Sequence, residues 1–65
     1  MQHGKAFKIA LIKLDKTQIS VAKELGVNPQ LVNQWSKKTR FTEEQMQMVL
    51  SVLGMKESEL VALVE

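Results

Sequence analysis

Four side-chain amides lie between residues 28 and 34, at Asn28, Gln30, Asn33 and Gln34. A carboxamide donates and accepts hydrogen bonds without carrying charge, so such groups suit recognition of a polar surface. Gln30, Asn33 and Gln34 would share one face of a helix, because their spacing is i, i+3, i+4. A segment that only fills a core does not need so many hydrogen-bonding side chains. The pattern predicts a face that recognises something outside the protein, and the alternative is an ordinary solvated helix surface.

The residues around these amides predict a corner between two helices. A small side chain at Ala22 lets two helix backbones approach closely, and Gly26 accepts the positive φ that a tight turn requires. Val27, Val32 and Trp35 are then placed to anchor the second helix of the pair to the core. This arrangement would leave the amides facing outward.

The first three elements that position the corner are predicted as helices. An i, i+3, i+4, i+7 apolar repeat indicates a helix over about residues 5–14. Thr17 is suited to cap a second helix, and Gly26 to end it. Asn28 as N-cap, with proline at the first helical position, begins a third helix over about residues 29–38. The predicted buried side chains are Phe7, Ala10, Leu11, Leu14, Val21, Ala22, Leu25, Val32 and Trp35.

Two further helices are predicted in the last third of the chain. Thr42 and Gln45 have capping-box spacing, and Gly54 is suited to end the helix that they begin. A fifth helix follows from about Glu57. The predicted buried side chains are Met46, Val49, Leu50, Leu53, Leu60, Leu63 and Val64. With no period-two run, repeat or linker, the sequence indicates an all-α single domain over residues 1–65.

Charge is divided unevenly along the chain. Residues 1–40 contain eight Lys and Arg against two acidic residues, a net charge of +6, whereas residues 41–65 contain one lysine against five glutamates, a net charge of −4. A polyanion would be attracted to the first part and repelled by the last. The alternative is a solvated charge pattern that serves no partner.

Composition disfavours several classes of function. The chain has no cysteine and a single histidine, His3, so we expect neither a metal site nor a cofactor. Thr17, Ser20 and Ser36 have no histidine placed to activate them, and the carboxylates gather at helix starts, so we expect no catalytic residues and no small-molecule substrate. The apolar runs are far shorter than the roughly 18 residues of a membrane span. The expectation is a soluble intracellular protein that is not an enzyme.

Three stretches resemble one protein family. QISVAKELGVNPQLVNQW resembles the helix-turn-helix of the Xre/Cro family of bacterial and phage repressors, whose DNA-binding domains are lambda-repressor-like. The tail EEQMQMVLSVLGMKESELVAL is similar to the last two helices of that family, and KTQ at residues 16–18 to the opening of its second helix. The resemblance covers about residues 5–64. It implies a compact five-helix bundle with a helix-turn-helix at the second and third helices.

The resemblance implies a sequence-specific regulator of transcription that binds double-stranded DNA, of the type of a Cro repressor from a phage or mobile element. Its third helix would lie in the major groove. Gln30 and Gln34 occupy the family's base-contacting positions, and Asn33 is a third candidate. A glutamine amide matches the N7 acceptor and N6 donor of adenine. The implied phosphate-contacting residues are Gln18, Asn28, Lys37, Lys38 and Arg40.

Family members usually act as homodimers, so an inverted-repeat operator with half-sites about 34 Å apart is expected. Met48 and Val52 form a second apolar stripe on the fourth predicted helix, and Val61 lies similarly off the inward face of the fifth. These three residues would form a dimer interface unless they are fully packed inside the domain. A dimer that forms only on DNA is compatible with so small a chain. The implied location is the cytoplasm of a bacterium or of a phage-infected host cell.

A rival interpretation is a protein-binding module on the same scaffold, such as an antirepressor or an antitoxin. Its anchors would be Leu31, Met48 and Val52. Leu31 is expected on the exposed side of the third helix, where it would contact a thymine methyl group, meet a protein partner, or do neither.

Overall fold

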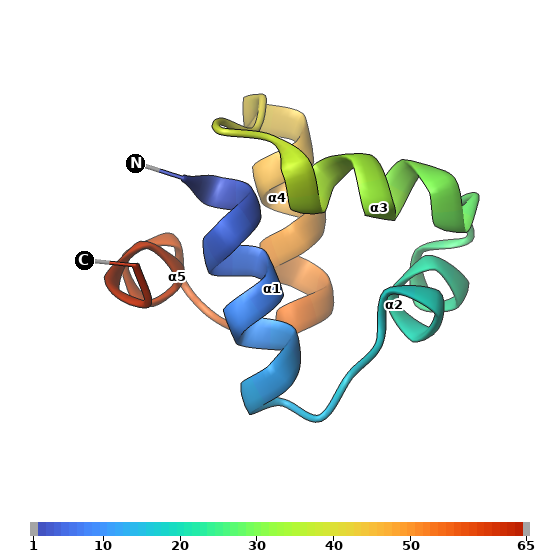
Figure 1. Ribbon diagram of the computed structural model, residues 1–65, viewed down its shortest axis with the longest axis horizontal. Coiled ribbons are helices and arrows are strands. Elements are labelled where there is room, and N and C mark those ends of the chain that lie inside the picture. The colour runs from blue at the N-terminus through green and yellow to red at the C-terminus, as the bar shows by residue number, and fades with distance from the viewer. Residues whose placement is uncertain (1, 65) are drawn as a thin grey trace.

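The computed structural model describes residues 2–64, and helices account for all of their regular structure (Figure 1). The predicted all-α class is confirmed, since these residues form no strand. The helices are α1 (His3–Lys13), α2 (Gln18–Leu25), α3 (Pro29–Lys37), α4 (Glu43–Leu53) and α5 (Glu57–Ala62).

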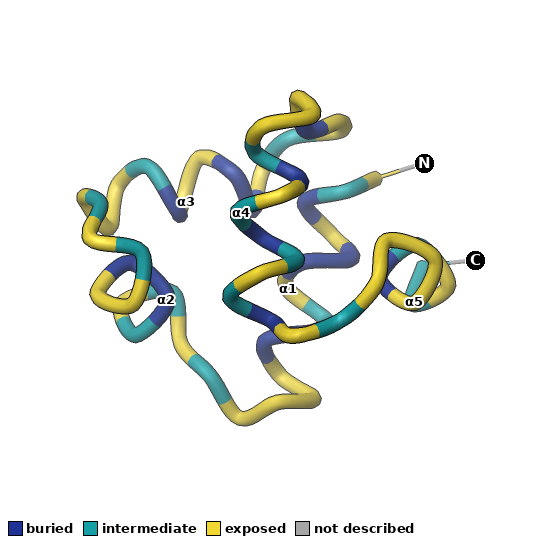
Figure 2. The backbone as a smooth tube through the Cα atoms, turned by 180° about the vertical axis from the view of Figure 1, so that it is seen from behind, coloured by how far each residue is buried: buried dark blue, intermediate teal, exposed yellow. Residues whose placement is uncertain are grey.

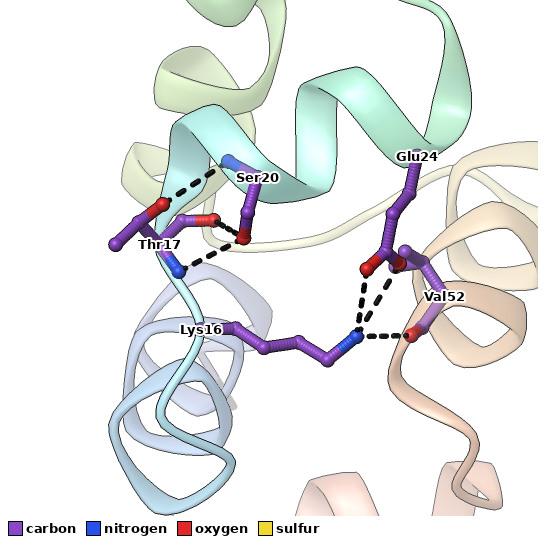
Figure 3. Close-up of polar contacts among 5 residues, drawn as sticks. All are labelled: Lys16, Thr17, Ser20, Glu24 and Val52. Atoms are coloured by element: carbon purple, nitrogen blue, oxygen red, sulfur yellow. Dashed lines mark hydrogen bonds and ion pairs between the residues drawn. The ribbon is translucent and has the colours of Figure 1, made fainter.

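The predicted caps at the starts of α2 and α4 are confirmed. The Ser20 N–H donates to Thr17 Oγ1 at 3.1 Å, and the Thr17 N–H donates to Ser20 Oγ at 3.1 Å (Figure 3). Thr42 and Gln45 make the same reciprocal pair. The Gln45 N–H donates to Thr42 Oγ1 at 3.2 Å, and the Thr42 N–H donates to Gln45 Oε1 at 3.0 Å. Each pair gives a partner to a backbone N–H at the helix start and to that of the N-cap residue.

Glycine ends α2 and α4 as the sequence predicts. Gly26 has φ 70° and Gly54 has φ 67°, in the left-handed region that side chains with a Cβ rarely adopt. Between α2 and α3 only residues 26–28 intervene, and Asn28 caps α3 as predicted, with Pro29 at the first helical position. Caps and glycines are local features, so sequence alone located these helix ends well.

All five helices contribute to one apolar core (Figure 2). Its fully buried large side chains are Trp35, Phe7, Leu60, Val21, Val32 and Val49. Met46 and Leu53 are buried as predicted, whereas Leu25, Leu50, Leu63 and Val64 are half-buried and pack at the edge of the core. Phe41, in the α3–α4 connection, joins the core and meets the Phe7 ring edge-on at 6.3 Å.

The start of α1 is joined to the end of α3 by backbone hydrogen bonds. The His3 N–H donates to Thr39 O and the Gly4 N–H to Lys38 O, both at 2.8 Å. His3 Nδ1 also accepts from the Phe41 N–H at 2.9 Å, and the centroids of the His3 and Phe41 rings are 5.4 Å apart. Helix α1 therefore begins at His3 rather than at residue 5. Carbonyl groups distant in sequence supply the partners that no side chain supplies, since Gln2 makes no side-chain cap.

Leu14 is not buried, contrary to the prediction from the apolar repeat. Its side chain is 39% exposed, because α1 ends at Lys13 and the chain reverses at Asp15, which has φ 56°. Ala6 joins Phe7, Ala10 and Leu11 in the core instead.

Helix α3 ends at Lys37, one residue before the predicted boundary. Leu31 is half-buried and packs against the core, so its expected placement on the exposed side is wrong.

None of the helices within residues 2–64 has both the length and the hydrophobicity that a membrane span requires.

Candidate functional site

The three predicted base-contacting residues are exposed on α3. Gln30, Asn33 and Gln34 follow the i, i+3, i+4 spacing, while Val32 and Trp35 are buried on the opposite side of the helix. Figure 1 shows α3 running across the view and α2 almost end-on, so the two helix axes are steeply inclined. The corner thus presents one polar face of α3 to solvent and holds its other face in the core.

The amides on this face remain available to an external partner. Within residues 2–64, the carboxamides of Gln30 and Gln34 make no hydrogen bond. Ser36 Oγ donates to Asn33 O at 2.6 Å and lies 3.5 Å from Asn33 Oδ1, which leaves the Asn33 side-chain nitrogen unengaged. Each amide therefore retains donors for an external partner.

Asn28 and Gln18 lie at the starts of α3 and α2. Asn28 Oδ1 accepts from the Gln30 N–H at 2.8 Å, which confirms the capping half of its expected role and leaves its Nδ2 free to donate. Gln18 is half-buried and is the first residue of α2, directly after the cap at Thr17. The first N–H groups of a helix lack intrahelical partners, so this end of α2 offers donors to an anion.

Of the three basic residues in and just after the last turn of α3, two make no polar contact with a described side chain and one is bound internally. Lys37 and Arg40 are exposed and form neither an ion pair nor a side-chain hydrogen bond with the described residues. Lys38 is half-buried, and its Nζ donates to Gln45 Oε1 at 2.9 Å. The Lys38 ammonium therefore helps to attach the end of α3 to the start of α4.

Lys16 is likewise engaged inside the domain. Its Nζ lies 3.1 Å from Glu24 Oε1 and 3.4 Å from Val52 O (Figure 3). Lys16 precedes α2 and Glu24 lies within it, so the single salt bridge among the described residues joins that segment to α2. The contact with the Val52 carbonyl group connects the same lysine to α4. Part of the positive charge of the first forty residues is used in folding rather than displayed.

Sequence reasoning missed two lysines that the fold brings to the end of α3. Lys5 and Lys8 of α1 line an open cleft of about 470 Å³ together with Lys37 and Lys38. The other lining residues are Gln2, Ser36 and Thr39. Their spacing puts Lys5 and Lys8 on the polar side of the first helix, but no local signal reveals that this helix begins beside the end of α3.

A second hollow, of about 310 Å³, carries the opposite charge. His3, Phe41, Glu43, Met46, Gln47 and Glu57 line it. Among residues 2–64, no cluster of three or more His, Cys, Asp or Glu side chains is arranged to hold a metal ion. The described lining of the first hollow is basic, and that of the second includes two glutamates.

The three residues predicted for a dimer interface are neither fully packed nor freely exposed. Met48, Val52 and Val61 are all half-buried. Met48 and Val52 pack against the core, whereas Val61 is not among the described side chains that do so. The most exposed large apolar side chains are Ile12 and Ile19, 79% and 58% exposed, which are far from this stripe in the sequence.

Comparisons of the chain with protein-family models, with curated proteins and with solved structures find no match.

Proposed function

We propose that this chain is a sequence-specific regulator of transcription that binds double-stranded DNA and reads the major groove with α3. The observation that carries the proposal is the exposed amide face of α3, formed by Gln30, Asn33 and Gln34, with Val32 and Trp35 anchoring the helix from behind. A rigidly held helix with unengaged amides suits readout of base edges, because the major groove admits a helix and displays a distinct donor and acceptor pattern for each base pair.

The charges around α3 support a polyanionic ligand. Lys37 is exposed in its last turn and Arg40 in the connection that follows, and the first backbone N–H groups of α2, at Gln18, have no partner among residues 2–64. Contacts of this kind fix the register of a protein on the duplex without specifying sequence. The resemblance to the Xre/Cro family suggests a Cro-type repressor from a phage or mobile element, with a helix-turn-helix at α2 and α3 of a lambda-repressor-like bundle.

The same resemblance suggests a homodimer on an inverted repeat, with half-sites about 34 Å apart. Val61 is the strongest candidate for an interface residue, because it is half-buried without packing on the core. A dimer that forms only on the operator would let each α3 enter the same face of the duplex.

The rival function, a protein-binding module such as an antirepressor or antitoxin, has less support. Its proposed anchors, Leu31, Met48 and Val52, are half-buried and pack against the core of their own domain. Residues already used for folding present little apolar surface to a partner.

A selection from random duplex DNA at physiological salt tests the proposal. An enriched inverted repeat would support a dimeric regulator and identify its operator, and a single enriched half-site would retain DNA recognition without the dimer. Failure of any sequence to become enriched would contradict the proposed function.

The Gln34→Ala variant tests the role of the amide face. It should lose about 1–3 kcal/mol of discrimination at one base pair, while its affinity for nonspecific duplex stays nearly unchanged. Competition binding against a set of single-base operator variants measures this loss. Gln47→Ala, which removes an exposed glutamine from α4, is the matched control and should behave as the wild type does. An equal loss on every sequence would exclude Gln34 as a reader.

A further inference from the structure

The lysine cleft between α1 and α3 is a concentrated positive surface beyond the amide face. Lys5 and Lys8 come from α1 and Lys37 and Lys38 from the end of α3, and none of the described residues that line the cleft is acidic. Lys5, Lys8 and Lys37 form no ion pair or side-chain hydrogen bond with the described residues. Like charges held close together repel one another, and a bound anion would relieve that repulsion.

Backbone contacts, rather than flexible side chains, fix the two walls of the cleft relative to each other. The His3 and Gly4 N–H groups donate to Thr39 O and Lys38 O, both at 2.8 Å, which sets the approach of α1 to α3. A Cβ at Gly4 would lie 2.6 Å from both Lys38 O and Ser36 O, so only glycine permits this approach. The stems of the lysines on the two walls therefore start from fixed positions.

The start of α1 reduces an obstacle to anion binding near the end of α3. The carbonyl end of a helix carries partial negative charge, which would repel an anion near the end of α3. Here two carbonyl groups just after α3 accept from the N-terminal N–H groups of α1. The positive end of α1 thus offsets the negative end of α3 at the edge of the cleft.

We infer that this cleft binds a phosphodiester of the DNA backbone outside the base pairs that α3 reads, with Lys5 and Lys8 as contacts additional to Lys37. The inference rests on the proposed function, since α3 must lie in the groove for its end to approach the flanking backbone. Gln2 and Thr39 add exposed neutral donors at the rim. The cleft would thereby extend the footprint of each protomer beyond its half-site.

The test uses the Lys5→Gln/Lys8→Gln variant on two duplexes that share the selected operator. One ends at the last selected base pair, and the other continues for about one helical turn on each side. On the longer duplex the variant should bind several-fold more weakly than the wild type. The slope of log K against log salt should become shallower by about one unit for each phosphate that the variant no longer neutralises. On the shorter duplex, variant and wild type should bind alike.

A charge-matched control separates local contact from overall attraction. Lys13→Gln/Lys56→Gln removes the same charge from two exposed lysines that do not line the cleft, so it should retain the wild-type dependence on flank length. Equal losses in both double variants, or wild-type binding by Lys5→Gln/Lys8→Gln on the longer duplex, would overturn the inference and leave the proposed function standing. If the wild type binds no duplex selectively, the proposed function itself fails.

A titration with inorganic phosphate, followed by the backbone amide signals of residues 2–8 and 36–39, distinguishes a free anion from the DNA backbone. Saturation that is abolished in Lys5→Gln/Lys8→Gln, together with unchanged binding of the longer duplex, would assign the cleft to a free anion and overturn the inference. Both lysines are exposed, so the variant should keep the thermal midpoint of the wild type.

Discussion

At the residue scale, Gly4 links the fold to the candidate phosphate contact. It is buried in the first turn of α1, where a Cβ would lie 2.6 Å from two backbone carbonyl oxygens, those of Ser36 and Lys38. Backbone atoms cannot rotate away as the end of a side chain can. The identity of this one residue therefore determines how closely α1 approaches α3, and hence the shape of the lysine cleft.

Replacing Gly4 with alanine should destabilise the protein, although alanine favours helix formation by about 1 kcal/mol relative to glycine. We expect a loss of about 1–3 kcal/mol in the free energy of unfolding, because the added methyl group forces the two helices apart. Chemical denaturation measures the difference. Ser51→Ala, at an exposed position within α4, is the control and should be neutral or slightly stabilising. A Gly4→Ala protein as stable as the wild type would show that the two helices can separate at little cost.

At the element scale, a residue at a helix start can cap the helix and also donate to an external anion. Asn28 illustrates both, because its Oδ1 satisfies the Gln30 N–H while its Nδ2 is left to donate outward. The first helical turn is a favourable site for negative charge, whether that charge belongs to a side chain or to a bound phosphate. A neutral cap such as Asn28 therefore leaves the start of α3 open to an anion. A negatively charged cap would repel that anion.

The Asn28→Asp variant separates these two tasks. Aspartate caps a helix about as well as asparagine does, and its charge suits the helix start, so the free energy of unfolding should stay within about 0.5 kcal/mol of the wild-type value. The affinity for the operator should fall about ten-fold or more, because a carboxylate replaces a donor beside a phosphate. Denaturation and fluorescence anisotropy measure the two quantities. Asn28→Ala, by contrast, should cost about 1 kcal/mol of stability. Undiminished affinity of Asn28→Asp would remove Asn28 from the phosphate contacts.

At the scale of the whole molecule, size limits what one copy can do. The Cα atoms span 29 × 23 × 17 Å, and a single copy would present only one α3 to a DNA duplex. A second copy would double the contacts, and the negative charge of α5, at Glu57 and Glu59, would favour a position for α5 away from DNA. Val61 of α5 lies in this acidic third of the chain, where a copy-to-copy contact would not compete with the duplex.

The Val61→Lys variant should weaken the cooperation between two half-sites by about ten-fold while binding an isolated half-site as the wild type does. The reason is that a charge would be placed in a small apolar contact between copies. Anisotropy titrations on duplexes with one and two half-sites measure both affinities. Ser58→Lys adds the same charge at an exposed position of the same helix and should leave cooperation intact. If the two variants behave alike, Val61 is not at the interface.

Much of the fold was predictable because its signals are local. Thr17, Thr42 and Asn28 accept from backbone N–H groups two or three residues away, and Gly26 and Gly54 adopt positive φ where helices end. Such interactions need no information from the rest of the chain. The same holds for the exposed amides of α3, whose placement follows from helical periodicity once Val32 and Trp35 are buried.

Only the tertiary structure decided how distant segments meet. The apolar repeat placed Leu14 in the core, but the reversal at Asp15 turns it outward, and α1 begins at His3 because carbonyl groups more than thirty residues away complete its first turn. The gathering of Lys5 and Lys8 beside Lys37 has the same origin. Long-range contacts depend on the packing of whole helices, and that packing minimises the free energy of the entire chain rather than of any one window. The sequence by itself therefore determined the helices and their caps, and the packing decided which charges share a surface.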